Sequence, residues 1–154
     1  MSQKGFTLIE LMVTLAVMAI LLGIAAPSFS QMLRDNRAAS ELNVFVSMFN
    51  FARSEAASRG LRVRVQGPLA VDDSWQVVRV TSGEVLRVFP ALSAFTVAPD
   101  GEKNMVFDAQ GRLEANAAVV FSVQAKTDYA SCEKYNREVT VNLAGTVTLR
   151  QEDC

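Results

Sequence analysis

The segment that decides the fold is residues 5–13, GFTLIELMV, near the start of the chain. It places one carboxylate, Glu10, inside an apolar run that extends from Phe6 to Ala26. As an α-helix this run would be roughly 31 Å long, which matches the hydrocarbon core of a bilayer. A charge at that depth costs about 2.5 to 3.5 kcal/mol or more, so ordinary membrane anchors avoid it. Glu10 therefore indicates a role that requires a charge within the membrane.

A cleaved signal peptide and a plain permanent anchor are the alternatives for this segment. A signal peptide would have a core of about 7 to 15 apolar residues before a small-residue cleavage site. Residues 23–26, GIAA, resemble such a cleavage site, but the apolar run before them is longer than the core of a signal peptide. A plain anchor explains the length of the run but does not explain Glu10. Lys4 supplies the cationic flank that is expected on the cytoplasmic side of a membrane span.

Composition bounds the remaining possibilities. The chain has 154 residues, of which half are hydrophobic and a fifth charged, so it can form one folded domain with an appendage. A formal net charge of −1 gives no general attraction to nucleic acid. Histidine, the usual general base and metal ligand, is absent. Asp72 and Asp73 are the nearest approach to a calcium site, but adjacent acids in a turn are usually solvated. The sequence predicts a protein that is not an enzyme and that binds no cofactor or metal.

The residues Lys4-Gly5-Phe6-Thr7-Leu8-Ile9-Glu10 resemble the processing signature of type IV pilins and type II secretion pseudopilins. The resemblance implies that a prepilin peptidase removes residues 1–5 by cutting between Gly5 and Phe6, and then methylates Phe6. It implies a single span, 6–26, in the bacterial inner membrane, with the head in the periplasm before the subunit enters a pilus or pseudopilus. The implied partners are other major and minor pilins or pseudopilins, the prepilin peptidase and the inner-membrane assembly platform.

Within this resemblance, Glu10 acquires a role in assembly. A carboxylate in lipid needs a partner, and the amine of Phe6 in a neighbouring subunit can supply one. An ion pair is stronger at low dielectric and selects the axial register between packed helices. We expect the unassembled subunit to leave Glu10 unsatisfied, which would favour its transfer from the bilayer to a filament.

Pro27 follows the apolar run, and a kink is expected there because proline lacks an N–H and clashes with the preceding turn. From 27 to 60, apolar residues recur at spacings of three and four, which predicts an amphipathic continuation of the helix. Gly60 is its expected C-cap. We expect the apolar stripe to form core: Phe29, Met32, Leu33, Leu42, Phe45, Val46, Phe49, Ala52 and Ala56.

After Gly60 the apolar period changes to two, which predicts β-strands. A long helix followed only by antiparallel strands gives an α+β fold of the type IV pilin kind, with a β-rich head at 61–154. The expected strands are 61–66, 75–80, 84–89, 104–108 and 119–124, followed by a hairpin of 139–143 with 147–149 that turns at Ala144-Gly145.

Two later patches refine the resemblance to the GspH/FimT/FimU group of minor pilins and pseudopilins. They are Ala52-Arg53-Ser54-Glu55-Ala56, and Met105-Val106-Phe107-Asp108 with Gly111. The resemblance implies a minor pilin that primes or takes part in type IV pilus assembly near the filament tip. The alternatives are an H-type minor pseudopilin of a type II secretion system and a DNA-capturing or adhesive tip pilin.

Cysteines and arginines give the last candidate sites. In an exported head Cys132 and Cys154 can form a disulfide that encloses the final hairpin, worth about 3 kcal/mol on a loop-entropy estimate. The resemblance supports this pairing, and two free thiols are the alternative. Arg62 and Arg64 are candidates for DNA binding. Some DNA-binding relatives carry Gly-Arg-x-Arg, but residues 145–148 here are GTVT, so we expect a solvated sheet face instead.

Overall fold

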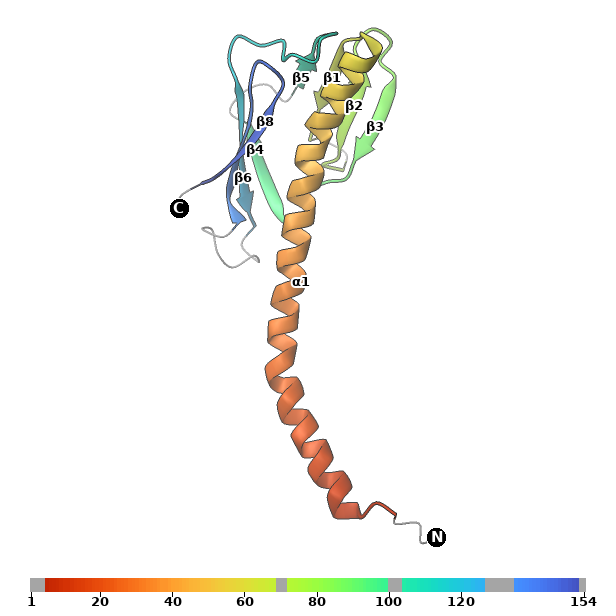
Figure 1. Cartoon of the computed structure of the whole chain (residues 1–154), viewed down its shortest axis with the longest axis vertical. Helices are drawn as coiled ribbons and strands as arrows, with labels where there is room; N and C mark the ends of the chain where they lie inside the picture. Colours follow the sequence, from red (N-terminus) through yellow and green to blue (C-terminus); the bar gives the residue numbers. More distant parts are fainter. Residues whose placement is uncertain (1–4, 69–71, 100–103, 127–134, 153–154) are drawn as a thin grey trace. The chain divides into compact units, whose positions relative to one another are not determined.

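The computed structural model describes residues 5–68, 72–99, 104–126 and 135–152. The chain divides into two compact units, Met1–Asn36 and Arg37–Cys154. One helix, α1 (Leu8–Arg59), contributes to both units (Figure 1). The eight strands of the described residues all belong to the second unit, which is called the head from here on.

Helix α1 ends where the sequence predicts. Gly60 follows its last residue with φ of 64°, and the N–H of Leu61 donates to the carbonyl oxygen of Ala56 at 3.1 Å. This bond and the left-handed glycine form a Schellman cap, so the prediction for Gly60 is confirmed. Pro27 lies inside the helix, which continues on both sides of it. The predicted kink at Pro27 stays a prediction.

The first unit leaves its apolar side chains uncovered. Phe6 is 83% exposed, and large apolar residues from Leu8 to Leu33 are all at least half exposed. The expectation that Phe29, Met32 and Leu33 form core is therefore wrong, since they are 53–60% exposed. The physical reason is that burial along the helix starts only at Ala38, within the head.

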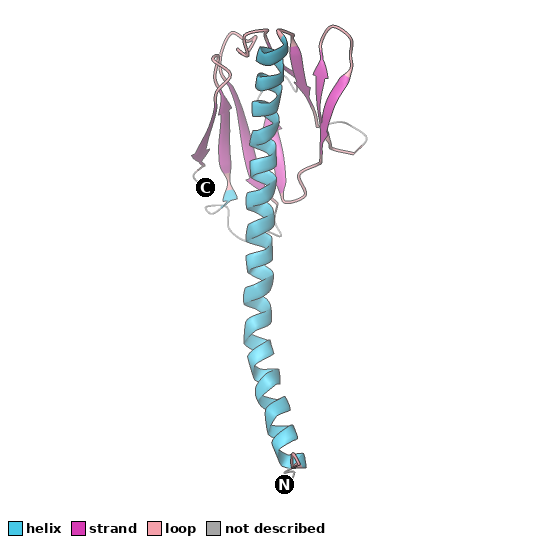
Figure 2. Ribbon diagram, turned by 45° about the vertical axis from the view of Figure 1, so that its right-hand side comes forward, coloured by secondary structure: helices cyan, strands magenta, loops and turns pink. Residues whose placement is uncertain are grey.

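The strands of the described part of the head form two antiparallel sheets (Figure 2). The first has the strand order β3-β2-β1-β5 and the second has the order β4-β6-β7-β8. The chain crosses between the sheets after β3, after β4 and after β5. The bounds are β1 Val63–Gln66, β2 Trp75–Arg79, β3 Val85–Phe89, β4 Phe95–Pro99, β5 Asn104–Phe107, β6 Val119–Ala125, β7 Arg137–Val141 and β8 Val147–Gln151.

The predicted strands are present, with two corrections. β4 was not predicted from the sequence, because its stretch holds only two large apolar residues, Phe95 and Val97, and ends in a proline. Proline is tolerated there since β4 is an edge strand. In the last hairpin, Val139 pairs with Leu149 and Val141 with Val147. Leu143 lies in the turn and not in the strand, and it is 46% exposed.

An aromatic cluster between the helix and both sheets forms part of the core of the head. The ring centroid of Phe45 lies 5.0 Å from that of Phe49, 5.3 Å from Trp75 and 5.7 Å from Phe121, each in an edge-to-face arrangement. Edge-to-face pairs add about 0.5–1.5 kcal/mol beyond area burial. The second half of α1 thus joins one sheet, through Trp75, to the other, through Phe121.

A polar contact holds the first crossover against the helix. The carboxylate of Glu41 on α1 accepts hydrogen bonds from the backbone N–H of Ala94 at 2.8 Å and from the hydroxyl of Ser93. Both donors lie immediately before β4. Glu41 therefore fixes where the chain enters the second sheet.

Candidate functional site

The candidate site begins at the N-terminal end of α1, where Thr7 and Glu10 bind each other. Glu10 Oε2 accepts from the backbone N–H and from the hydroxyl of Thr7, each at 3.0 Å. In return, the N–H of Glu10 donates to Thr7 Oγ1 at 3.3 Å. Thr7 is the N-cap residue and Glu10 the third helical residue, so the pair forms a capping box.

This arrangement changes the expectation for the unassembled subunit. Glu10 is not left without partners, because one of its carboxylate oxygens binds Thr7. No described residue donates to its second oxygen, Oε1, at hydrogen-bonding distance. The capping box thus directs the carboxylate toward the N-terminal end of the helix while one oxygen stays open to a further donor.

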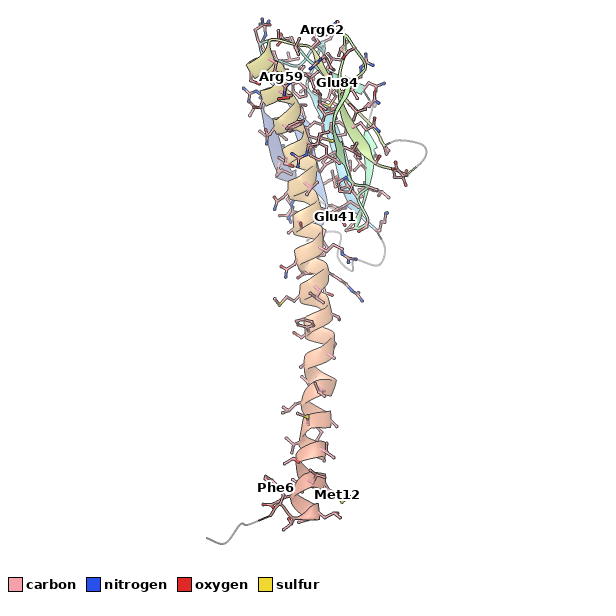
Figure 3. All side chains as sticks on the ribbon, turned by 90° about the vertical axis from the view of Figure 1, so that its right-hand side faces the viewer. Phe6, Met12, Glu41, Arg59, Arg62 and Glu84 are labelled. Carbon is pink, nitrogen blue, oxygen red and sulfur yellow. The ribbon has the colours of Figure 1, made fainter. Side chains whose placement is uncertain are left out.

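Gly5 and Phe6 precede the helix, and both are exposed. Apart from the two chain neighbours of Gly5, no atom of the described residues lies within 4 Å of the position that a Cβ at Gly5 would take. Figure 3 shows the Phe6 side chain at the N-terminal end of the ribbon. The peptide bond between Gly5 and Phe6 is therefore outside regular secondary structure and sterically accessible.

The helix that follows has the properties of a membrane span. Among the described residues, α1 is the one helix long and apolar enough to cross a bilayer, and its most apolar part has no buried residue. Glu10 is the one acidic residue in its first turn. The N-terminal segment of α1 therefore combines a capping carboxylate with apolar side chains that are exposed.

A second cluster lies in the head, where the two later sequence patches meet. A side chain on Gly111 would place its Cβ 3.1 Å from Cγ and 3.2 Å from the carbonyl oxygen of Arg53. A side chain on Gly145 would collide with the carbonyl oxygen of Gly111. Both glycines have positive φ, 73° and 76°, so each is required for its conformation as well as for space. The helix and two turns thus contact one another through Arg53 and two glycines.

Asp108 organises the turn that carries Gly111. Its Oδ1 accepts from the N–H of Arg112 at 2.8 Å and of Gln110 at 2.9 Å, and its Oδ2 accepts from Arg112 Nε at 3.0 Å. The backbone donor of Arg112 is the main cause that lowers the pKa of Asp108 below its ordinary value. The carboxylate of Asp108 therefore stabilises the turn through these hydrogen bonds.

Two sequence comparisons bear on this combination of features. Residues 41–145 match the profile described as "Type II transport protein GspH", and residues 1–26 match the profile described as "Prokaryotic N-terminal methylation motif". The first match covers more than half of the chain. The chain belongs to the GspH family. It is thus a minor pilin or pseudopilin of the type IV pilin superfamily, a structural class of subunit.

Solved structures agree with this membership. The GspH-family chain is similar to the type IV minor pilin FimU of Pseudomonas aeruginosa in two crystal forms. One comparison gives 25% identity over 79% of this chain and 92% of that chain, with a TM-score of 0.60. The other gives 26% identity over 73% and 90%, with a TM-score of 0.56. The α+β pilin fold expected from the sequence is therefore confirmed.

The structure places the remaining predicted residues as follows. The Nε of Arg62 donates to Glu114 Oε1 at 2.7 Å, so this cation is compensated by an acid. Arg64 lies on β1 and is half-buried, opposite Val78 and Val106. Neither observation adds to the case for DNA binding, which stays untested.

Cys132 and Cys154 lie outside the described residues, so the disulfide stays a prediction. Ser74 lowers the pKa of Asp72, first through a hydrogen bond from its side chain and then through its backbone N–H, which donates to Asp72 Oδ1 at 3.1 Å. Within the described part of the chain no cluster of three His, Cys, Asp or Glu side chains is close enough to hold a metal.

Sequence reasoning missed Thr7, although the spacing Thr-x-x-Glu before an apolar run is the signal of a capping box.

Proposed function

We propose that this GspH-family subunit primes or joins type IV pilus assembly near the filament tip. The observation that carries the proposal is the exposed apolar helix with an acid in its first turn, attached to a head that has a complete core of its own. A helix that is apolar on all sides is stable only in lipid or against other helices. The side chains of this apolar segment are exposed, so the membrane and then the filament are its natural surroundings.

Processing prepares the N-terminus for this role. Prepilin peptidase cuts between Gly5 and Phe6 and methylates Phe6, which leaves the apolar segment as a single span in the bacterial inner membrane with the head in the periplasm. The exposed, non-helical position of this bond supports cleavage there. The inner-membrane assembly platform then delivers the subunit to other pilins.

Glu10 is the assembly charge in this proposal. The amine of Phe6 in a neighbouring subunit binds the open Oε1 while Thr7 holds Oε2. An ion pair at low dielectric fixes the axial register between the two helices. Pro27 bends the helix in the filament core, and a bond between Cys132 and Cys154 closes the end of the head.

The test is incorporation of variants into filaments. Glu10→Leu in the full chain, expressed in cells that lack the native copy, should reduce the amount of subunit in sheared filaments about tenfold or more, because the register-setting ion pair is lost. Met12→Leu is the matched control in the same helix and should incorporate normally. Incorporation of Glu10→Leu at the level of the control would contradict the proposal. N-terminal sequencing of the mature chain should begin at N-methylated Phe6.

A type II secretion pseudopilin is the second candidate, because the matching family profile carries the description of a type II transport protein. The two candidate functions predict different phenotypes when the gene is deleted. Deletion of the gene should abolish surface pili and leave protein secretion intact if the subunit belongs to a pilus. Loss of secretion with normal pili would assign it to the secretion system.

A further inference from the structure

Strand β3 leaves one backbone edge of the head open. β3 is the outermost strand of the order β3-β2-β1-β5, so within the described part of the chain no strand pairs with its second edge. Figure 1 shows it on the outer side of its sheet. Val85 and Val88 on this strand are 47% and 55% exposed. Open edges with exposed apolar residues are the surfaces on which proteins add a further strand.

Arg87, between these valines, is held by two aromatic rings. Its Cζ lies 4.8 Å from the ring centroid of Phe89 on β3 and 5.3 Å from that of Phe51 on α1. These are cation–π distances. The neighbouring acid, Glu84, is already paired with Arg79 at 2.8 Å. Arg87 makes no ion pair within the described residues, so its exposed guanidinium is oriented and still lacks a carboxylate.

The register determines which face of the sheet carries each group. Arg87 lies opposite the buried Val77, and Val88 lies opposite the half-buried Gln76. Successive strand residues point to opposite faces, so Arg87 is on the helix side and Val88 is on the outer side. The pairs from Arg87 to Phe89 are regular, and the irregularity of this pairing lies between Val77 and Val78. Val85 consequently lies opposite Val78, which places it on the same side of the sheet as Val88.

We propose that the β3 edge binds an extended segment of another subunit of the filament, in which acidic and apolar residues alternate. The segment adds a strand beside β3, with its carboxylate against Arg87 and its apolar side chains beside Val85 and Val88. Charge complementarity selects this occupant, because a basic or uncharged strand would leave the guanidinium unpaired. The inference rests on the proposed function, since it requires that the chain stands in a filament.

The short β3 edge is sufficient for binding when both subunits stand in a filament. A strand of five residues forms few backbone hydrogen bonds, and an isolated peptide would bind it weakly. Helices that are already packed in a filament raise the effective concentration of neighbouring heads to about the millimolar range. The β3 contact then selects which neighbour is accepted.

The test uses the full chain in filament-forming cells, with p-benzoylphenylalanine in place of Val88. Illumination should cross-link it to another filament subunit, and mass spectrometry should map the bond to an extended segment that contains an acidic residue. The matched control carries the photoreactive residue at Gln124, which is exposed on the inner strand β6 and should give no such product. Adding Arg87→Glu should lower the yield from Val88 about tenfold, because the contact becomes repulsive. Arg150→Glu, at an exposed residue of β8, should not.

The outcomes separate this proposal from the proposed function. Incorporation into filaments without a cross-link from Val88 would overturn the β3 contact alone. A bond to a helix, to a segment without acids or to nucleic acid would overturn it equally, and so would a yield that Arg87→Glu leaves unchanged. If the unsubstituted chain is absent from sheared filaments, both proposals fail.

Discussion

The two halves of helix α1 have opposite surroundings, and the half with the higher apolar content is the exposed one. In residues 8–36, the large apolar side chains are at least half exposed. In residues 37–59, Phe45 is 2% exposed, and Met48 and Phe49 are fully buried. The difference shows that apolar content does not decide burial. The second half has two sheets of its own chain against it, whereas the first half depends on lipid or on other subunits.

The distribution of polar residues makes the same distinction. On the second half, Asn43, Ser47, Asn50 and Ser54 recur at spacings of three and four and are exposed, so this half has one polar face and one buried face. Along residues 8–26 the polar side chains are Glu10 and Thr14, and the latter donates to the carbonyl oxygen of Leu11 at 2.9 Å. A helix of the first kind suits a globular head, and a helix of the second kind suits a bilayer.

Phe49→Ala should produce the largest effect on the head. Phe49 contacts the rings of Phe45 and Phe121, and its removal leaves a cavity that costs about 3–5 kcal/mol of unfolding free energy. Trp75 is the single tryptophan and is 3% exposed in the head, so its fluorescence during denaturant unfolding of the detergent-solubilised chain reports this loss.

Leu15→Ala is the matched control from the first half. Leu15 is 58% exposed, so its truncation should leave the unfolding free energy of the head unchanged within about 0.5 kcal/mol. Equal losses from Phe49→Ala and Leu15→Ala would break the comparison. They would mean that the first half is part of the cooperative unit of the head.

Gly145→Ala should have the next largest effect. The added methyl group collides with the carbonyl oxygen of Gly111, and the backbone holds a positive φ of 76°. Backbone strain of this kind costs about 1–3 kcal/mol before the collision is counted. Gly83→Ala has a similar φ of 70° but open space around it, and should lose only the strain. Gly23→Ala, in the first half of the helix, should leave the midpoint unchanged. A midpoint for Gly145→Ala equal to that of Gly83→Ala would show that the contact with Gly111 yields without cost.

Much of this comparison could be predicted from the sequence. The apolar run, the spacing of Phe45, Phe49 and Ala52, and Gly60 as a cap are local patterns, and the structure agrees with them. The period-two alternation is also a local pattern, and it predicted seven of the eight strands in the described part of the chain. The class of protein followed from the residues around Gly5 to Glu10.

The rest depended on tertiary contacts that no local pattern encodes. The position along the helix where burial starts, Ala38, is set by how far the sheets extend, so Phe29 was assigned to the core in error. β4 forms because β6 pairs with it, although its own alternation is too short to predict a strand. The meeting of Arg53, Gly111 and Gly145 joins segments far apart in sequence, and the contacts of Arg87 with Phe51 and Phe89 join a strand to the helix.

The acid response of the head gives the smallest expected effect. The pKa of Asp108 is lowered mainly by the backbone N–H of Arg112, and the pKa of Glu114 is lowered mainly by hydrogen bonds from Arg62. A carboxyl whose folded pKa is lowered adds stability above its ordinary pKa, and this stability is lost as the pH falls through the folded value. The unfolding midpoint of the head should therefore decrease as the pH falls from about 5 to below about 3.

Asp108→Asn tests the assignment of this acid response. The asparagine retains an oxygen for the backbone donors but cannot titrate, so the variant should be less stable at pH 7 and lose less stability in acid. Gly23→Ala changes no titrating group and should keep the wild-type profile. If Asp108→Asn loses as much stability in acid as the wild type, the response arises elsewhere in the head, and the turn at Asp108 is held mainly by its backbone contacts with Gly111 and Arg112.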